Sequence, residues 1–203
     1  MKKIILASRS ADRNELFKHI KIPFEVIFSD INEEYYKENF LNVYELVQEL
    51  AKAKALNIKN KLSNTNLEAI IIAADTLVEI NGTIIGKAVD KDHAFRILKK
   101  LSGQSHNLIT GIAITEVSHP KLICDYDKTI VHFSNISENE IKAYLETDEW
   151  IGRAGAYSIR DKAALFIDSI EGSSSNVVGL PLNKLFRIIK DEFRLNLLKL
   201  YNH

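Results

Sequence analysis

The sequence predicts an α/β fold in which a mixed, twisted sheet is flanked by helices. Apolar runs typical of buried strands alternate along the chain with amphipathic segments typical of helices. Two long β-rich runs, 107–117 and 121–133, surround a turn at 118–120, which predicts an antiparallel ribbon. With 203 residues, the chain has room for a single domain over 1–203, built as two lobes with a central cleft between them.

Strands and helices alternate in the first half of the chain. Ser10 is a plausible N-cap for the first helix, because a serine hydroxyl can accept a hydrogen bond from a backbone N–H there. The stretch 29–40 is polar, acidic and aromatic, which favours a loop. Asn81-Gly82 is a strong hairpin signal. The expected strands are Lys3–Ala7, Phe24–Phe28 and Ile70–Val78, and the expected helices are Ala11–Ile20, Val43–Leu62 and Asp90–Leu101.

The second half follows the ribbon with one well-marked helix. Ser137 and Glu140 have the spacing of a capping box, which predicts a helix that runs to about Glu146. Proline is favoured in the first turn of a helix, so Pro181 marks the start of another. The remaining expected segments are a strand at Ala163–Ile170, a Gly/Ser loop at Glu171–Asn176 and a final helix from Pro181 to about Leu200.

Charge and cysteine content narrow the class of protein. Acidic and basic side chains cancel, with 27 of each, which argues against a surface that coats nucleic acid. Cys124 is the only cysteine, so neither an internal disulfide nor a cysteine metal cage is expected. No apolar run approaches the ~20 residues that span a bilayer. We therefore expect a cytoplasmic protein that binds neither nucleic acid nor a membrane.

Asp75 is the first candidate for chemistry. It interrupts the apolar run 70–74, and a carboxylate there is costly unless it is paired, binds a cation or opens into a cleft. The hairpin at Asn81-Gly82 could return the chain so that Lys87 approaches Asp75. A carboxylate with a nearby lysine suits a Mg²⁺-dependent phosphate enzyme. The alternative is an Asp at a strand end that bonds to backbone.

The segment 8–13, between a strand and a helix, is the second candidate. Backbone N–H groups at a helix start, together with Ser8, Ser10 and an arginine, form an anion site. Arginine can also contact phosphate through two parallel hydrogen bonds. The alternative is a capped helix whose arginine is solvated.

Four other features carry weaker signals. Glu33 could ligate a metal, although a solvated acidic loop is the plainer interpretation. Lys54 is expected on the helix surface unless that helix lines a cleft. His106 could be a base or a ligand, but a loop histidine is the simpler expectation. The segments 152–160 and 176–182 could form the wall of a base pocket, or only a loop and a helix start.

Six motifs occur in a fixed order along nearly the whole chain. They are Leu6-Ala7-Ser8-x-Ser10-x-x-Arg13-x-Glu15-Leu16, Ala74-Asp75-Thr76-x-Val78 followed by Gly86-Lys87, Leu101-Ser102-Gly103-Gln104-x-His106, Thr110-Gly111, Ala154-Gly155-Ala156-Tyr157-x-Ile159 and Asn176-Val177-Val178-Gly179-Leu180-Pro181-Leu182. Together they resemble the Maf family, also called septum formation proteins.

This resemblance implies a nucleoside triphosphate pyrophosphatase with an inosine triphosphatase-like fold. Such enzymes split a nucleoside triphosphate into a monophosphate and diphosphate with a divalent cation, Mg²⁺ or Mn²⁺, and the family is often dimeric. Asp75 would be the catalytic residue, acting as base or through the metal, and Glu33 would assist the metal. The residues implied to hold phosphates are Ser8, Arg13, Lys54 and Lys87.

A covalent nucleophile is not expected. Opening a phosphoanhydride requires charge neutralisation and an oriented water rather than an attacking side chain. The only cysteine lies in the ribbon, and no serine–histidine pair is evident in the sequence.

Two positions depart from the family pattern. Ala11-Asp12 stand where the family usually has Pro-Arg. Arg160 stands where Gln is common in the branch that acts on dTTP and UTP, and Glu in the branch that acts on 7-methyl-GTP. Both positions are associated with base selection. Thr76 favours the branch that acts on dTTP and UTP. The alternatives are a pyrophosphatase for 7-methyl-GTP or ITP, and a nucleotide-binding regulator without turnover.

Overall fold

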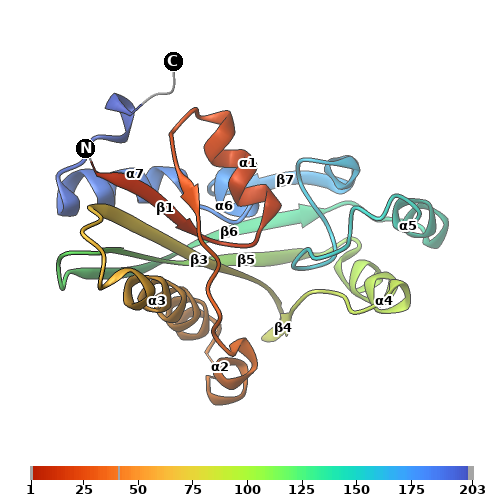
Figure 1. The fold of residues 1–203 in the computed structure, drawn as a ribbon. Coiled ribbons are helices and arrows are strands. Elements are labelled where there is room, and N and C mark those ends of the chain that lie inside the picture. Colours follow the sequence, from red (N-terminus) through yellow and green to blue (C-terminus); the bar gives the residue numbers. More distant parts are fainter. Residues whose placement is uncertain (1, 41, 201–203) are drawn as a thin grey trace. The chain divides into compact units, whose positions relative to one another are not determined.

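The computed structural model describes residues 2–40 and 42–200 and confirms the α/β class. Its mixed sheet has the strand order β2-β1-β3-β5-β6-β7, and β4 pairs with β3 (Figure 1). The strands are β1 (Lys3–Ala7), β2 (Glu25–Val26), β3 (Ala69–Ile80), β4 (Thr83–Ile85), β5 (Ser105–Glu116), β6 (Leu122–Phe133) and β7 (Ile167–Glu171).

Helices of varied length connect these strands. The α-helices are α1 (Ala11–His19), α2 (Glu33–Asn39), α3 (Val43–Leu62), α4 (Lys91–Leu101), α5 (Glu138–Leu145), α6 (Ser174–Val177) and α7 (Leu182–Phe193), and the 3₁₀ helices are η1 (Lys162–Phe166) and η2 (Leu197–Lys199). Among the described residues, no helix is both long and apolar enough to cross a bilayer.

The chain forms two compact units. The first contains residues 1–75, 110–127 and 179–203, and the second contains 76–109 and 128–178. Strands β3, β5 and β6 contribute residues to both units. The expected cleft between two lobes stays a prediction.

The sheet of the first unit is covered on both faces. Strand β1 pairs in parallel with β3. In each strand, successive side chains point to opposite faces of the sheet. One set packs with α3, as Ile5 and Ile71 do with Ala55. The alternate set packs with α1 and α7, whose positions on the other side are visible in Figure 1. Burial on both faces explains the unbroken apolar run 70–74.

Gly111 lets β5 approach α3 closely. A Cβ atom at this position would lie 2.2 Å from the carbonyl oxygen of Val47, a backbone atom of α3. Real Cβ atoms do not approach backbone this closely, so only glycine fits here. The Thr110-Gly111 motif therefore has a packing role in the first unit.

The second unit contains the predicted hairpin and its own core. Asn81 and Gly82 have φ angles of 50° and 76°, as a two-residue turn with positive φ at both positions requires. Strands β3 and β4 are antiparallel there, with Val78 opposite Ile85. The capping box of Ser137 and Glu140 is present at the start of α5.

Five predicted elements were wrong in extent or type. Of the expected strand Phe24–Phe28, only Glu25–Val26 forms β2. The expected loop 29–40 contains α2. This helix has no apolar stripe in its sequence, because none of its residues is buried. Of the expected strand 163–170, the first part is η1 and only the end is β7. The expected loop 171–176 ends in the short helix α6, which the Ser173 side chain caps. The final helix stops at Phe193, because Arg194 adopts a left-handed conformation with φ 55°.

Candidate active site

Asp75 lies inside β3 and faces α3. It continues the series Ala69, Ile71 and Ala73, which packs with α3, so the two-residue period of the strand directs its side chain to that helix. The residue is 9% exposed. The sequence placed Asp75 at the end of an apolar strand, whereas β3 continues to Ile80. Asp75 accepts a hydrogen bond from a lysine side chain, so the alternative of an Asp that bonds only to backbone is wrong.

Lys54 is that partner. Its Nζ donates to Oδ1 of Asp75 at 2.6 Å and lies 2.8 Å from Oε1 of Glu33. Lys54 belongs to the buried stripe of α3, one turn from Leu50 and from Ile58, and it is 8% exposed. The expectation that Lys54 lies on the helix surface was therefore wrong. A buried ammonium needs anionic partners, and here it has two carboxylates.

Glu33 reaches Lys54 from the first turn of α2. A carboxylate at this position is favoured by the positive end of the helix dipole. Its side chain is 45% exposed, so it remains in contact with solvent. Glu33 and Asp75 thus offer carboxylate oxygens to the same small region around one ammonium group.

Ser8 and Arg13 form the second half of the site. Nη1 of Arg13 donates to Oγ of Ser8 at 3.2 Å, and its Nε donates to the carbonyl oxygen of Gly179 at 2.6 Å. Ser10 caps α1 as predicted, since its side chain accepts from the backbone N–H of Arg13. Arg13 is 8% exposed, so the alternative of a solvated arginine does not hold for it.

Burial lowers the pKa of Arg13 from its usual value, and the negative charges of Asp75 and Glu33 act in the opposite direction. The guanidinium stays charged, because arginine side chains do not lose their proton in proteins. The first unit therefore holds two cationic groups, Arg13 and Lys54, near two carboxylates. Cations of this kind bind phosphate oxygens, and a carboxylate accepts a proton from water.

The Gly179 carbonyl is a contact that the sequence did not reveal. The segment 176–182 was expected to form the wall of a base pocket or only a loop and a helix start, and the first expectation stays a prediction. Within it, the carbonyl oxygen of Gly179 accepts a hydrogen bond from Nε of Arg13. Gly179 has a φ of 101°, a conformation that favours glycine.

Lys87, Thr76 and Arg160 belong to the second unit. Lys87 is exposed and forms an isolated antiparallel bridge with Ala154, and Gly155 N donates to the Gly86 carbonyl oxygen at 3.2 Å. The Ala154–Gly155 segment therefore fixes the backbone that carries Lys87. Arg160 is exposed and Thr76 is half-buried. The expected approach of Lys87 to Asp75 stays a prediction.

His106 lies in β5 and is 2% exposed, so the expectation of a loop histidine was wrong. Its Nε2 is 2.8 Å from the hydroxyl of Tyr157, and both rings contact Phe133. Burial, with a smaller effect from nearby His132, lowers the pKa of His106 from 6.5 to about 4. The side chain is therefore neutral at pH 7 and packs within the core of the second unit.

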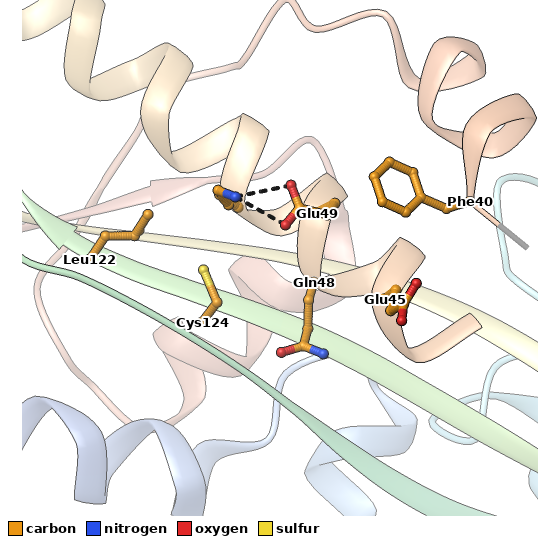
Figure 2. Close-up of a pocket in the computed structure, with 7 residues that line it drawn as sticks. Phe40, Glu45, Gln48, Glu49, Leu122 and Cys124 are labelled. Carbon is orange, nitrogen blue, oxygen red and sulfur yellow. Dashed lines mark hydrogen bonds and ion pairs between the residues drawn. The ribbon is translucent and has the colours of Figure 1, made fainter. Parts of the chain in front are cut away.

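A hollow of about 450 Å³ lies elsewhere in the first unit. Figure 2 shows Gln48 of α3 and Cys124 of β6 on its wall, together with Glu49, which bonds to Lys52. The wall contains none of the predicted site residues. Burial raises the pKa of the Cys124 thiol, which makes it a poor nucleophile.

Comparison with known proteins decides the family. The family model described as Maf-like protein matches residues 3–192. This chain belongs to the Maf family. The match includes every candidate site residue named from the sequence.

Curated Maf relatives are similar along almost their full length. A dTTP/UTP pyrophosphatase of Alkaliphilus oremlandii is 46% identical over 98% of this chain and 100% of its own. A dTTP/UTP pyrophosphatase of Clostridium tetani is 43% identical over 92% of this chain and 96% of its own. A solved dITP/XTP pyrophosphatase from Mycobacterium abscessus is a weak match, with a TM-score of 0.35 and 11% identity over 66% of this chain and 75% of that one.

Proposed function

We propose that this Maf protein hydrolyses nucleoside triphosphates to monophosphates and diphosphate, with dTTP and UTP as preferred substrates. The observation that carries the proposal is the buried Lys54, held between Asp75 and Glu33 in the same unit as the buried Arg13. Relatives named dTTP/UTP pyrophosphatase support the choice of base.

Each side chain of the candidate site has a proposed role in the reaction. Ser8, Arg13 and Lys54, all of the first unit, bind phosphate oxygens. Lys87, which belongs to the second unit, is proposed as a further positively charged phosphate ligand. Asp75 accepts a proton from the water whose attack on phosphorus breaks the phosphoanhydride bond between the first and second phosphorus atoms, so that the monophosphate and diphosphate leave. Lys54 orients Asp75, because its hydrogen bond to Oδ1 fixes the carboxylate plane. No covalent intermediate is required, since charge neutralisation and positioning account for most of this chemistry.

A divalent cation, Mg²⁺ or Mn²⁺, is the proposed cofactor. Within residues 2–40 and 42–200, no group of three or more His, Cys, Asp or Glu side chains is placed to hold a metal. Mg²⁺ is commonly bound by only one or two carboxylates, with substrate phosphates and waters as the other ligands. Glu33 and Asp75, which share Lys54, fit this donor set. A bound cation would neutralise charge on the phosphates.

Thr76 and Arg160 are proposed to contribute to base selection. Arg160 is exposed. Burial is the main cause that lowers the pKa of Arg153, and the positive charge of Arg160 acts in the same direction. Arg160→Gln restores the residue common in the dTTP/UTP branch, so we expect it to retain activity on dTTP and to alter its KM.

The proposed setting is the cytoplasm, and the proposed assembly is a homodimer that binds neither nucleic acid nor membranes. The single cysteine supports the cytoplasmic setting. The balanced net charge supports the absence of nucleic-acid binding. Sedimentation equilibrium of the purified protein tests the homodimer, since a single species of monomer mass would contradict it.

A nucleotide panel with released diphosphate as the readout tests the function. The panel contains dTTP, UTP, 7-methyl-GTP, ITP and the standard purine triphosphates, each with Mg²⁺ and with Mn²⁺. We expect the highest kcat/KM with dTTP and UTP. A preference for 7-methyl-GTP or ITP would reassign the substrate, and tight binding without diphosphate from any nucleotide would indicate a regulator.

A further inference from the structure

Three polar side chains form a chain of hydrogen bonds across β5, β6 and β7 in the second unit. Ser105 Oγ lies 2.6 Å from Nδ1 of His132, and Nε2 of His132 lies 2.9 Å from Oε1 of Glu171. None of the three belongs to the proposed pyrophosphatase site. The sequence suggested no serine–histidine pair, and the structure corrects that expectation.

Strand pairing brings these residues together. Phe133 N donates to the Gln104 carbonyl oxygen at 3.0 Å, which places the next residues along the two strands, Ser105 and His132, side by side. In the β6–β7 pair, His132 is opposite Ser169, two residues from Glu171 on the same face. The contacts span 27 and 39 residues of sequence.

The carboxylate fixes which nitrogen of His132 carries the proton. An ionised Glu171 can only accept a hydrogen bond, so Nε2 must be the N–H that donates to it. In a neutral imidazole, Nδ1 is then the unprotonated nitrogen, and the Ser105 hydroxyl donates to it. A serine that donates to a histidine base, which a carboxylate orients, is the arrangement that activates nucleophilic serines.

We propose that Ser105 is a nucleophilic modification site that reacts with activated carboxylic esters. Ser105 is exposed, so a small ester can reach its Oγ. His132 Nδ1 takes the hydroxyl proton as the bond from Oγ to the ester carbonyl carbon forms. The carbon–oxygen bond to the leaving alcohol then breaks, and the alcohol departs with that proton. The products are an O-acyl serine and one alcohol.

Ser134 provides a comparison within the same chain. Its hydroxyl donates to Oδ1 of Asp168, so it has a carboxylate partner but no histidine base. A carboxylate that directly accepts from serine is a weaker base than imidazole at neutral pH. Ser134 should therefore react far more slowly than Ser105.

Acetylation by p-nitrophenyl acetate tests the proposal on the full chain, without nucleotide or metal. Peptide mass spectrometry follows the acetyl group on each residue, and hydroxylamine distinguishes serine esters from stable lysine amides. We expect an ester at Ser105 that forms at least about 100-fold faster than one at Ser134. This comparison requires no variant, so it does not depend on whether a substitution folds.

Two variants test the role of the histidine base. His132→Gln should slow acetylation of Ser105 by about 100-fold, because a general base contributes about that factor or more. Ser134→Ala is the matched control and should leave the Ser105 rate unchanged. The proposal would be overturned by equal acetylation rates at Ser105 and Ser134, or by acetylation of lysines alone. It would also be overturned if Ser105 reacted at the wild-type rate in His132→Gln. Diphosphate release is not measured, so failure here leaves the proposed function unaffected.

Discussion

Lys54 Nζ lies 2.6 Å from Asp75 Oδ1, and the two side chains are only 10% and 13% exposed. Helix α3 supplies the lysine and β3 supplies the aspartate, on facing surfaces of the first unit. Removing two charges from water costs several kcal/mol per ion, and the cost is offset only when they pair. The pair is therefore both a stability element and the centre of the proposed site.

Replacing Lys54 should destabilise the protein. Lys54→Met leaves Asp75 buried without its ammonium partner, and we expect the free energy of unfolding to fall by about 3 kcal/mol. Diphosphate release should fall with it, because a phosphate-binding charge is lost. Urea unfolding with circular dichroism measures the first effect.

Lys52→Met is the matched control on the same helix. Lys52 pairs with Glu49 at 3.0 Å, but the side chains are 39% and 34% exposed. Surface pairs of this kind contribute at most about 1 kcal/mol. Equal unfolding free energies for the two variants would show that the buried pair has no special role in stability.

Gly111→Ala should also destabilise the protein, by about 1–3 kcal/mol, because the added methyl group meets the Val47 carbonyl oxygen. Gly86→Ala is the control, since a Cβ there meets nothing within 4 Å. We expect that control to change stability by no more than about 0.5 kcal/mol. Thermal unfolding measures the midpoint temperature of both variants. Similar midpoints would contradict the close packing of β5 on α3.

His106 should make stability depend on pH. Burial lowers its pKa from 6.5 to about 4, so the folded state favours the neutral ring. The resulting contribution is fully present above pH 6.5 and is lost as the pH falls from 6.5 towards 4. Its size is about 3 kcal/mol.

Urea unfolding at pH 7 and pH 4.5 measures this contribution. Wild type should lose more stability between the two pH values than His106→Gln, which cannot titrate. Tyr157→Phe should keep the wild-type dependence, because desolvation is the main cause of the lowered pKa. An identical pH dependence in wild type and His106→Gln would refute the assignment.

Hydrophobic periodicity and capping residues predicted most helices and strands. They fail for elements that bury no residue or have no capping signal. Ser10, Asp90 and Ser137 cap α1, α4 and α5, because capping depends on residues close in sequence. Helix α2 was missed because it buries no residue and so has no apolar period. It is supported locally instead, by the Glu34–Lys37 ion pair and the stacked rings of Tyr36 and Phe40.

The candidate site was only partly readable from sequence. Asp75 stood out because a charge interrupted an apolar run. Lys54 was expected on the surface, although its position on the apolar stripe of α3 was a signal that it could be buried. The pairing of Ser105 with His132 depends on the register between β5 and β6, and the sequence pattern predicted the two strands but not that register.

The most direct test is diphosphate release by Asp75→Asn with dTTP and UTP in the presence of Mg²⁺ or Mn²⁺. Asparagine has nearly the same shape and still offers an oxygen to Lys54, but it cannot accept a proton from water. We expect kcat to fall by at least about 10³-fold while circular dichroism shows an intact fold. Asp125→Asn, at an exposed pair with Lys184, should turn over at the wild-type rate. Wild-type turnover by Asp75→Asn would contradict the proposed role of this carboxylate.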